Sequence, residues 1–152
     1  MTDLLLERQG WGNQTTGGDG GAQIVASDLV SLRAALESTD PAYVTFIPGT
    51  IITVDTPIMV KSNKTLDGRG SGVTIKGSKM VSALWLQGVE NIIVSDVKFD
   101  GQWPIYDQSA DAAGDAIHLE GTNNIWVHHC HILHWADGAV DCRPDTLNTN
   151  IS

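Results

Sequence analysis

The sequence repeats itself, and this repeat restricts the possible folds more than any other feature. Without a gap, ALWLQGVENIIVSDVKF (83–99) aligns with AIHLEGTNNIWVHHCHI (116–132) at an offset of 33 residues. Weaker copies occupy 57–70 and 139–152. The units consist of short runs typical of β-strands, which are separated by Gly, Asn, Asp and Ser. Repeats of about 20–50 residues that contain strands and no helix indicate a solenoid, and here they predict a parallel β-helix.

Asparagines recur at matched turns of these units, at Asn63, Asn91 and Asn124. Side-chain amides at such positions can form a ladder of hydrogen bonds from one coil to the next. Asparagine also tolerates the left-handed backbone conformation that tight turns require. Either explanation accounts for the pattern.

The segment before the repeats has a different pattern. In SDLVSLRAALES (27–38), the leucines recur at the spacing of one helix face, and Ser27 is a suitable N-cap. A short amphipathic helix at this place would cover the open end of the solenoid, as terminal units require. The run YVTFIPGTIITV (43–54) then predicts the first strands.

The chain has the length of a single domain, and we expect residues 1–152 to form one β-helix. It ends within a repeat, at TNIS, where a solenoid would leave a strand edge and its core exposed. We therefore expect the chain to be the N-terminal part of a longer domain. The full-length protein is expected to be a monomer.

Composition restricts the possible partners. Apolar residues make up 41% and charged residues 18% of the chain, which is typical of a globular protein. The net charge of −9 argues against nucleic acid, whose phosphates require a basic surface. No apolar run approaches the roughly 20 residues that a membrane-spanning helix needs, so we expect no membrane partner. Cys130 and Cys142 are too few for a disulfide scaffold and are expected to be free thiols.

Three carboxylates lie near one another in two successive units. Matching the threonines of the following turns places Asp141 opposite Ile117, two positions from Asp115 on the neighbouring strand. Such diagonal neighbours have Cβ atoms roughly 7–8 Å apart, and a Ca²⁺ ion with oxygen ligands at about 2.3–2.6 Å fits between them. Asp137, in the preceding turn, can add a third oxygen. The alternative is an ordinary Asp-Gly turn beside solvated surface charges.

The run HHCH (128–131) resembles a transition-metal cluster. Side chains alternate along a strand, however, so His128 and His129 are expected to face opposite sides of the sheet. No second group of ligands has the spacing typical of zinc sites. The sequence therefore argues against a transition-metal site here.

Several short motifs follow one another in an order that is more specific than any of them alone. They are GWGNQTTGGDGGA (10–22), GTI (49–51), KSNKTLDGRGSGVTIKG (61–77), NIIVSDVKF (91–99), GDAI (114–117), NIWVHHC (124–130) and DGAVD (137–141). In this order the chain resembles the pectate lyases, a family of right-handed parallel β-helix proteins. The resemblance covers almost the whole chain but only the first half to two-thirds of a typical family domain.

The resemblance implies calcium-dependent β-elimination on polygalacturonate, outside the cell. By the same resemblance, Asp115, Asp137 and Asp141 stand where relatives bind Ca²⁺, and Arg143 stands where they place a substrate-binding lysine. Arg143 is otherwise an ordinary exposed arginine. Two other functions fit the scaffold: a polysaccharide-binding β-helix without catalysis, as in adhesins and tail fibres, or another pectin-degrading enzyme.

The sequence also departs from the family pattern. Many relatives have another aspartate at the position of Ala113, and its absence predicts weak calcium binding without substrate. The family's base arginine would lie beyond Ser152, so this chain alone is expected to be inactive. Proton removal by a positioned base contributes typically about 10²–10⁴-fold to a rate.

Overall fold

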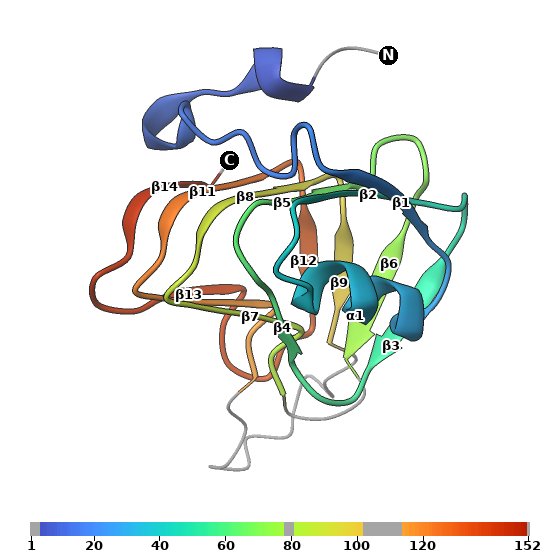
Figure 1. The fold of residues 1–152 in the computed structure, drawn as a ribbon. Helices are drawn as coiled ribbons and strands as arrows, with labels where there is room; N and C mark the ends of the chain where they lie inside the picture. The colour runs from blue at the N-terminus through green and yellow to red at the C-terminus, as the bar shows by residue number, and fades with distance from the viewer. Residues whose placement is uncertain (1–3, 78–80, 102–113, 152) are drawn as a thin grey trace.

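The computed structural model describes residues 4–77, 81–101 and 114–151, and its strands wind into a right-handed parallel β-helix (Figure 1). In spatial order, the six-stranded sheet contains β1 (Ala22–Ala26), β2 (Ala42–Phe46), β5 (Lys64–Asp67), β8 (Glu90–Ser95), β11 (Asn123–His128) and β14 (Leu147–Ile151). The β10 sheet contains β13 (Val140–Cys142), β10 (Ile117–Glu120), β7 (Leu84–Gln87) and β4 (Ile58–Met59). The β9 sheet contains β12 (His131–Leu133), β9 (Lys98–Asp100), β6 (Thr74–Gly77) and β3 (Ile51–Val54).

Each full coil contributes one strand to each sheet, and neighbouring strands pair in parallel. The predicted repeat of 33 residues is confirmed between two coils, because Leu86 pairs with Leu119 and Ile92 with Ile125. Other coils have different lengths, so the offset is not constant through the chain. The predicted fold class is therefore correct, while the repeat describes only one of the steps between coils.

The matched asparagines lie at one corner of successive coils. Asn63, Asn91 and Asn124 have left-handed φ angles of 61°, 61° and 54°. The side-chain Nδ2 of Asn91 also donates to Oδ1 of Asn63 at 2.7 Å. Both explanations of the pattern are thus correct for the first two asparagines, which turn the backbone and bond from coil to coil.

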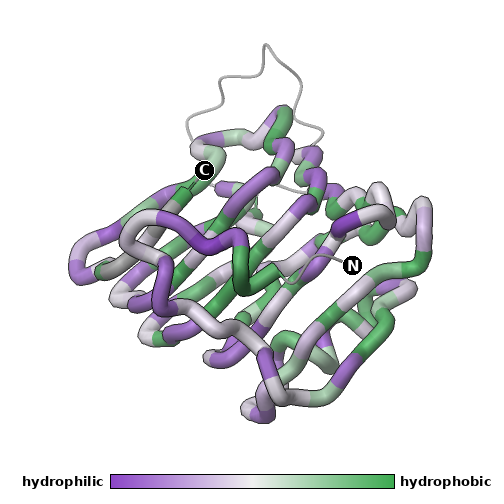
Figure 2. Tube along the Cα trace, turned by 90° about the horizontal axis from the view of Figure 1, so that it is seen from above, coloured by the Kyte–Doolittle hydropathy of each residue, from purple (hydrophilic) through white to green (hydrophobic). Residues whose placement is uncertain are grey.

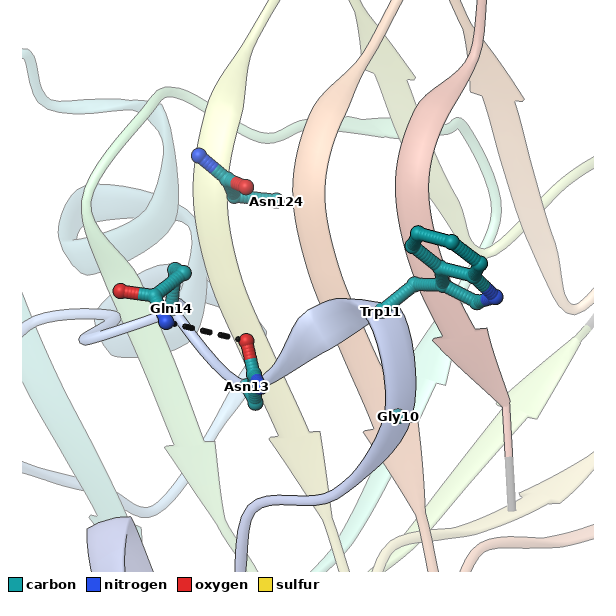
Figure 3. A pocket seen from close by; sticks show the side chains of 5 residues that line it. All are labelled: Gly10, Trp11, Asn13, Gln14 and Asn124. Atoms are coloured by element: carbon teal, nitrogen blue, oxygen red, sulfur yellow. Dashed lines mark hydrogen bonds between the residues drawn. The ribbon is translucent and has the colours of Figure 1, made fainter.

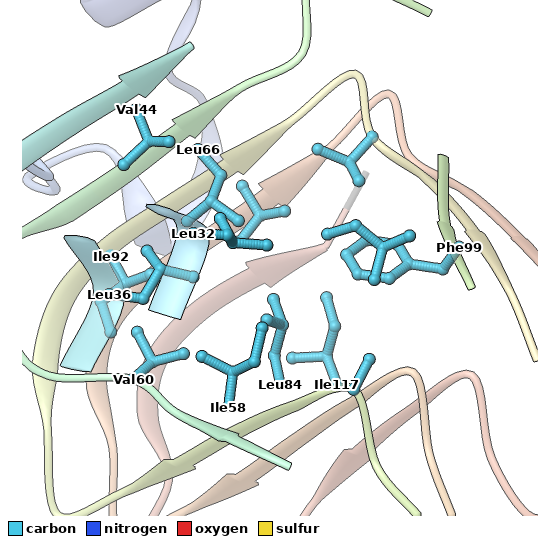
Figure 4. Close-up of a cluster of buried hydrophobic side chains, with 14 of the residues drawn as sticks. Leu32, Leu36, Val44, Ile58, Val60, Leu66, Leu84, Ile92, Phe99 and Ile117 are labelled. Carbon is cyan, nitrogen blue, oxygen red and sulfur yellow. The ribbon is translucent and has the colours of Figure 1, made fainter. Parts of the chain in front are cut away.

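Apolar side chains fill the interior of the coil in rows that run from strand to strand (Figure 4). What we call the inward row of the β10 sheet consists of Ile58, Leu84, Ile117 and Val140. The first three have no exposed surface. Apolar and polar residues alternate along the coils (Figure 2), as expected for strands with one buried face. Removing these side chains from water is the main stabilising contribution.

Helix α1 (Leu29–Glu37) covers the end of the coil beside β1 and β4, as predicted (Figure 1). Its Leu32 and Leu36 side chains are fully buried against the interior. The N-cap is Asp28 and not Ser27 as predicted, because the Asp28 carboxylate accepts a hydrogen bond from the backbone N–H of Ser31 at 2.8 Å. No helix in the described ranges is long and apolar enough to cross a membrane.

Strand β1 was not among the predicted strands, although it pairs with β2 along its whole length. Most of its side chains are exposed or half-buried, so it lacks the apolar alternation that marks the other strands. The two short helices before it, η1 (Leu4–Glu7) and η2 (Gly10–Gly12), lie over the outer face of the six-stranded sheet (Figure 1). Leu4 packs there against Ile93 and Trp126.

Candidate metal and substrate site

The outer face of the β10 sheet carries a row of side chains that changes character from coil to coil. What we call the outward row consists of Met59, Trp85, His118 and Asp141, which pair in register through β4, β7, β10 and β13. The Trp85 and His118 rings stack, with centroids 3.9 Å apart. His118 is only 3% exposed, so the imidazole is held between the indole and the acidic end of the row.

His118 brings two of the predicted carboxylates together. Its Nδ1 lies 3.5 Å from Oδ2 of Asp115 and 3.4 Å from Oδ2 of Asp141. One ligand atom from each of these three residues lies within 4.8 Å of the others. Two oxygens bound to one Ca²⁺ at about 2.3–2.6 Å can be separated by such a distance. The two carboxylate oxygens therefore fit a hard divalent cation, which takes oxygen ligands, and the imidazole lies beside them.

Asp115 is the buried member of the cluster. Its Oδ1 accepts a hydrogen bond from the backbone N–H of Gly138 at 2.9 Å. A Cβ atom at Gly138 would lie 2.7 Å from the same oxygen, so a larger residue would displace the Asp115 carboxylate from this position. Burial raises the pKa of Asp115, as do the charges of Asp141 and Asp137, whereas hydrogen bonds from Gly138 and His118 lower it. Since burial prevails, the ionised form of Asp115 is disfavoured, and a bound cation would stabilise it.

Asp137 stands slightly apart from the other two carboxylates. It is exposed, in the turn before β13, and its backbone N–H donates to the carbonyl of Gly114 at 3.1 Å. Its charge acts on Asp115, but it is not one of the three residues whose ligand atoms converge. Ala113, where many relatives have an aspartate, lies outside the described residues.

The predicted pairing of Asp141 with Ile117 is wrong by one residue. In the structure Asp141 pairs with His118, and Val140 pairs with Ile117. Asp141 and Asp115 are therefore three positions apart in register, and they meet because Asp115 lies before the strand begins. His118 was missed for the same reason, since its place opposite Asp141 depends on the correct register.

The error arises at the corner between β13 and β14. Thr122 and Thr146 do match, and the backbone N–H of Leu147 donates to the Thr122 carbonyl at 2.7 Å. The segment 140–147, however, contains one residue more than the equivalent segment 117–123. The offset between paired residues in the six-stranded sheet is therefore not the offset in the β10 sheet, and one cannot be used to predict the other.

Arg143 lies beside the carboxylates and is exposed. Its Nε donates to Oδ2 of Asp141 at 2.7 Å, and this bond raises the pKa of Arg143. An open hollow next to the cluster is lined in part by Gln87, Glu120 and Arg143. The guanidinium therefore lies between the carboxylate of Asp141 and a surface that a ligand can reach.

The HHCH run also differs from its prediction. Strand β11 ends at His128, and His129 has a left-handed φ of 51°, so the alternation of a regular strand stops there. As a result, Nδ1 of His128 and Nδ1 of His129 lie only 2.7 Å apart. Cys130 and Cys142 are free thiols, and burial raises the pKa of Cys130 to about 11.

A second hollow lies on the outer face of the six-stranded sheet, between the η2 segment and β11 (Figure 3). Its lining residues are Gly10, Trp11, Asn13, Gln14 and Asn124. None of them is an acid or a base that titrates near neutral pH. This hollow can offer stacking and amide contacts, but it has no group for acid–base chemistry.

Several known proteins similar to this chain are pectate lyases. A family model described as pectate lyase matches residues 7–149. Pectate lyase 5 of Ambrosia artemisiifolia is 32% identical over 95% of this chain and 41% of its own length. Probable pectate lyase 13 of Arabidopsis thaliana is 31% identical over 94% of this chain and 30% of its own length. The chain thus spans less than half the length of these relatives.

One solved structure extends the comparison to the fold. The crystal structure of Jun a 1, the major allergen from cedar pollen, superposes with a TM-score of 0.76 at 21% identity. The superposed region covers 95% of this chain and 47% of the Jun a 1 chain. At this identity the likeness establishes the shared β-helix and nothing about chemistry.

Proposed function

We propose, because this chain belongs to the pectate lyase family, that it forms the cation-binding and substrate-binding part of a site that cleaves polygalacturonate by β-elimination. The observation that supports the proposal most is the meeting of Asp115, His118 and Asp141 on the outer face of the β10 sheet. Polygalacturonate lies outside cells, and so we also propose an extracellular location.

We assign the cation site to Asp115 and Asp141, with Asp137 as a further oxygen ligand, and the cation to Ca²⁺. When bound, Ca²⁺ would withdraw charge from a galacturonate carboxylate and so make the neighbouring C5 proton more acidic. The buried Asp115 accepts a hydrogen bond from Gly138, while Asp141 and Asp137 are more exposed and can adjust to the substrate. The site contains few carboxylates, and therefore weak calcium binding is expected without polygalacturonate.

Arg143 is proposed to bind a substrate carboxylate. A guanidinium matches a carboxylate with two parallel hydrogen bonds, and the exposed position of Arg143 allows it to leave Asp141 when substrate and cation arrive. The negative charge of the protein does not prevent binding of a polyanion, because the cation and Arg143 lie between the two.

Arg143 is a poor candidate for the base that removes the C5 proton. Its bond to Asp141 raises its pKa and stabilises the protonated form. The guanidinium groups of Arg33 and Arg69 bond to Glu37 and Asp67, and that of Arg8 bonds to backbone carbonyls. We therefore propose that the base is an arginine outside residues 1–152, and that this chain alone binds the polymer without cleaving it.

The test measures binding and cleavage separately. Retention of the chain on polygalacturonate is compared with Ca²⁺ and with a chelator, for wild type and for Asp141→Ala. We expect retention that requires Ca²⁺ and is lost in the variant, and no ultraviolet absorbance from an unsaturated product. Equal retention with Ca²⁺ and with a chelator would favour a non-catalytic polysaccharide-binding β-helix. Strong calcium-dependent cleavage would instead make Arg143 the first base to test.

A further inference from the structure

We propose a second metal site, which takes a Zn²⁺-like transition-metal ion through Asp96, His128 and His129. These residues lie at the corner that follows β8 and β11, on the six-stranded sheet. One ligand atom from each of them lies within 4.8 Å of the others. The proposed lyase reaction uses none of these three residues, so the two proposals can be tested independently.

The corner brings these side chains together because two consecutive coils turn at the same position. Ser95 pairs with His128, so Asp96 and His129 are the next matched residues. Both have left-handed φ angles, 55° for Asp96 and 51° for His129. The backbone N–H of Asp96 donates to the carbonyl of His128 at 3.2 Å, which holds the two coils in register. His129 therefore lies beside His128 and does not point to the opposite face.

The two imidazoles approach each other through their nitrogens. The Nδ1 atoms lie 2.7 Å apart, and the rings are nearly perpendicular, with an interplanar angle of 79°. Two nitrogens bound to a tetrahedral Zn²⁺ at about 2.0–2.1 Å lie roughly 3.3 Å apart. The exposed His129 side chain needs to move by only a fraction of an ångström to reach that separation.

His128 is held as a rigid ligand. It is 1% exposed and stacks on Trp126 with ring centroids 3.7 Å apart and planes 5° apart. Its Nε2 atom has no hydrogen-bond partner among the described residues, so the contact with His129 is the polar contact that remains to a buried ring. Because Nδ1 is the atom that faces His129, it is the atom that would bind a metal, and the buried Nε2 would carry the proton.

The charges around His128 suit a cation. Burial lowers the pKa of His128, which favours the neutral ring that a metal requires. His129 and Arg69 act in the same direction, whereas Asp96 and Glu7 raise that pKa. Asp96 and Glu7 are therefore the two groups whose charge favours a cation at this ring.

Asp96 completes the set with an oriented oxygen. The hydroxyl of the fully buried Ser95 donates to its Oδ2 at 2.5 Å, which fixes the carboxylate as metal-binding carboxylates usually are. Zn²⁺ accepts imidazole nitrogens together with a carboxylate oxygen, whereas Ca²⁺ is bound by oxygen ligands and has little affinity for the two imidazoles. The exposure of His129 leaves a path for the ion and room for a water ligand.

The test measures Zn²⁺ binding to the whole chain by competition with a chromogenic chelator. Asp141→Ala is present throughout, because it removes a ligand from the cluster at His118. We expect one Zn²⁺ per chain, and at least about 100-fold weaker binding when His129→Asn is added, since even indirect ligand supports are worth about 10–100-fold. Asparagine tolerates the left-handed backbone at this position and removes the imidazole. Asp96→Asn should also weaken binding.

His134→Asn is the matched control. His134 is likewise exposed, has a φ of 52° and lies 3.1 Å from a carboxylate oxygen of Asp100. We expect this variant to bind Zn²⁺ as tightly as its parent, and Co²⁺ in the parent to give a visible spectrum that His129→Asn loses. The absence of stoichiometric Zn²⁺ binding, or equal affinity in His129→Asn and its parent, would overturn the proposal. Displacement of Zn²⁺ by equimolar Ca²⁺ would overturn it as well.

Discussion

The inward and outward rows of the β10 sheet occupy the same four strands, yet they meet opposite requirements. The first three members of the inward row have no exposed surface, and all four are aliphatic. The outward row changes from Met59 to Trp85, His118 and Asp141, and thus from apolar to acidic along the solenoid. One backbone register therefore positions both the core and the candidate site.

This comparison explains why register matters so much in such a fold. Side chains alternate with a period of two, so a slip of one residue would exchange the two rows. Asp141 placed opposite Ile117 would belong to the inward row, where a carboxylate has no partner. The observed pairing with His118 puts it among polar groups instead. The two rows should accordingly respond differently to mutation.

The largest expected effect on stability lies in the inward row. Leu84→Ala removes a fully buried side chain from the middle of the row and leaves a cavity, which should cost about 2–5 kcal/mol in free energy of unfolding. The matched change in the outward row is Met59→Ala, where the side chain is 43% exposed and the loss should be about 0.5 kcal/mol. Urea unfolding measures both. Equal losses would contradict the distinction between the rows.

Calcium binding, in contrast to stability, should depend on residues at the outer face of the β10 sheet. In Asp115→Asn, the loss of the buried charge should weaken Ca²⁺ binding in the presence of polygalacturonate by at least about 100-fold, since a direct ligand is lost. Calorimetry with Ca²⁺ measures this, and a chelator should reverse the binding in wild type.

Asp55→Asn is the control for that experiment, because Asp55 is an exposed carboxylate in a turn far from the β10 sheet's acidic end. It should leave the heats unchanged. Equal calcium affinity for wild type and Asp115→Asn would remove Asp115 from the site.

The inward side of the fold could be predicted from the sequence because apolar periodicity reports burial directly. The repeat between 83–99 and 116–132 and the helix at 27–38 were both recognisable. The edge strand β1 was not, since most of its side chains are exposed or half-buried and their pattern carries little information. The helix cap was misplaced by one residue, from Asp28 to Ser27, because both residue types are good N-caps.

The outward side could be predicted only in part. Asp115 and Asp141 were expected close together, and the structure brings both to His118. His118 itself and the contact between His128 and His129 depend on the length and conformation of corners. A single extra residue after β13 and one left-handed φ at His129 are enough to change which side chains meet, and neither has a clear mark in the sequence.

A smaller effect is expected at the cap of the interior. Asp28→Ala removes the carboxylate that accepts hydrogen bonds from Ser31, and loss of an N-cap costs typically about 1 kcal/mol. Leu32 and Leu36 would still pack against the core, so the helix should persist. Thermal unfolding measures the change, and Ser27→Ala is the control. A larger loss in Ser27→Ala would show that the cap is misassigned.

The smallest effect is on the pH dependence of stability. It should have opposite signs for two carboxylates, Asp67 and Asp115. Asp67, at the end of β5, accepts hydrogen bonds from the Tyr43 hydroxyl at 2.6 Å and from Arg69 at 2.7 Å. Burial alone would raise its pKa, but the hydrogen bonds from Arg69 and Tyr43 lower it on balance. Asp115 has no lysine or arginine within ion-pair distance among the described residues, and burial raises its pKa.

These shifts predict opposite contributions to stability in the absence of Ca²⁺. A lowered pKa means that Asp67 stabilises the fold above its unfolded pKa, near 3.8, and that this contribution is lost as the pH falls through its folded pKa. A raised pKa means that the contribution of Asp115 is complete below the unfolded value and is lost as the pH rises through its folded pKa. Urea unfolding at a series of pH values measures this. Between acid and neutral pH, the free energy of unfolding should rise less in Asp67→Asn than in wild type, and more in Asp115→Asn than in wild type. Ca²⁺ at a saturating concentration should cancel the difference for Asp115 alone, because a bound cation stabilises the same ionised carboxylate that burial opposes. If both variants changed the pH dependence in the same direction, Asp115 would be a carboxylate satisfied by the protein, and the outward row would have no need of a cation.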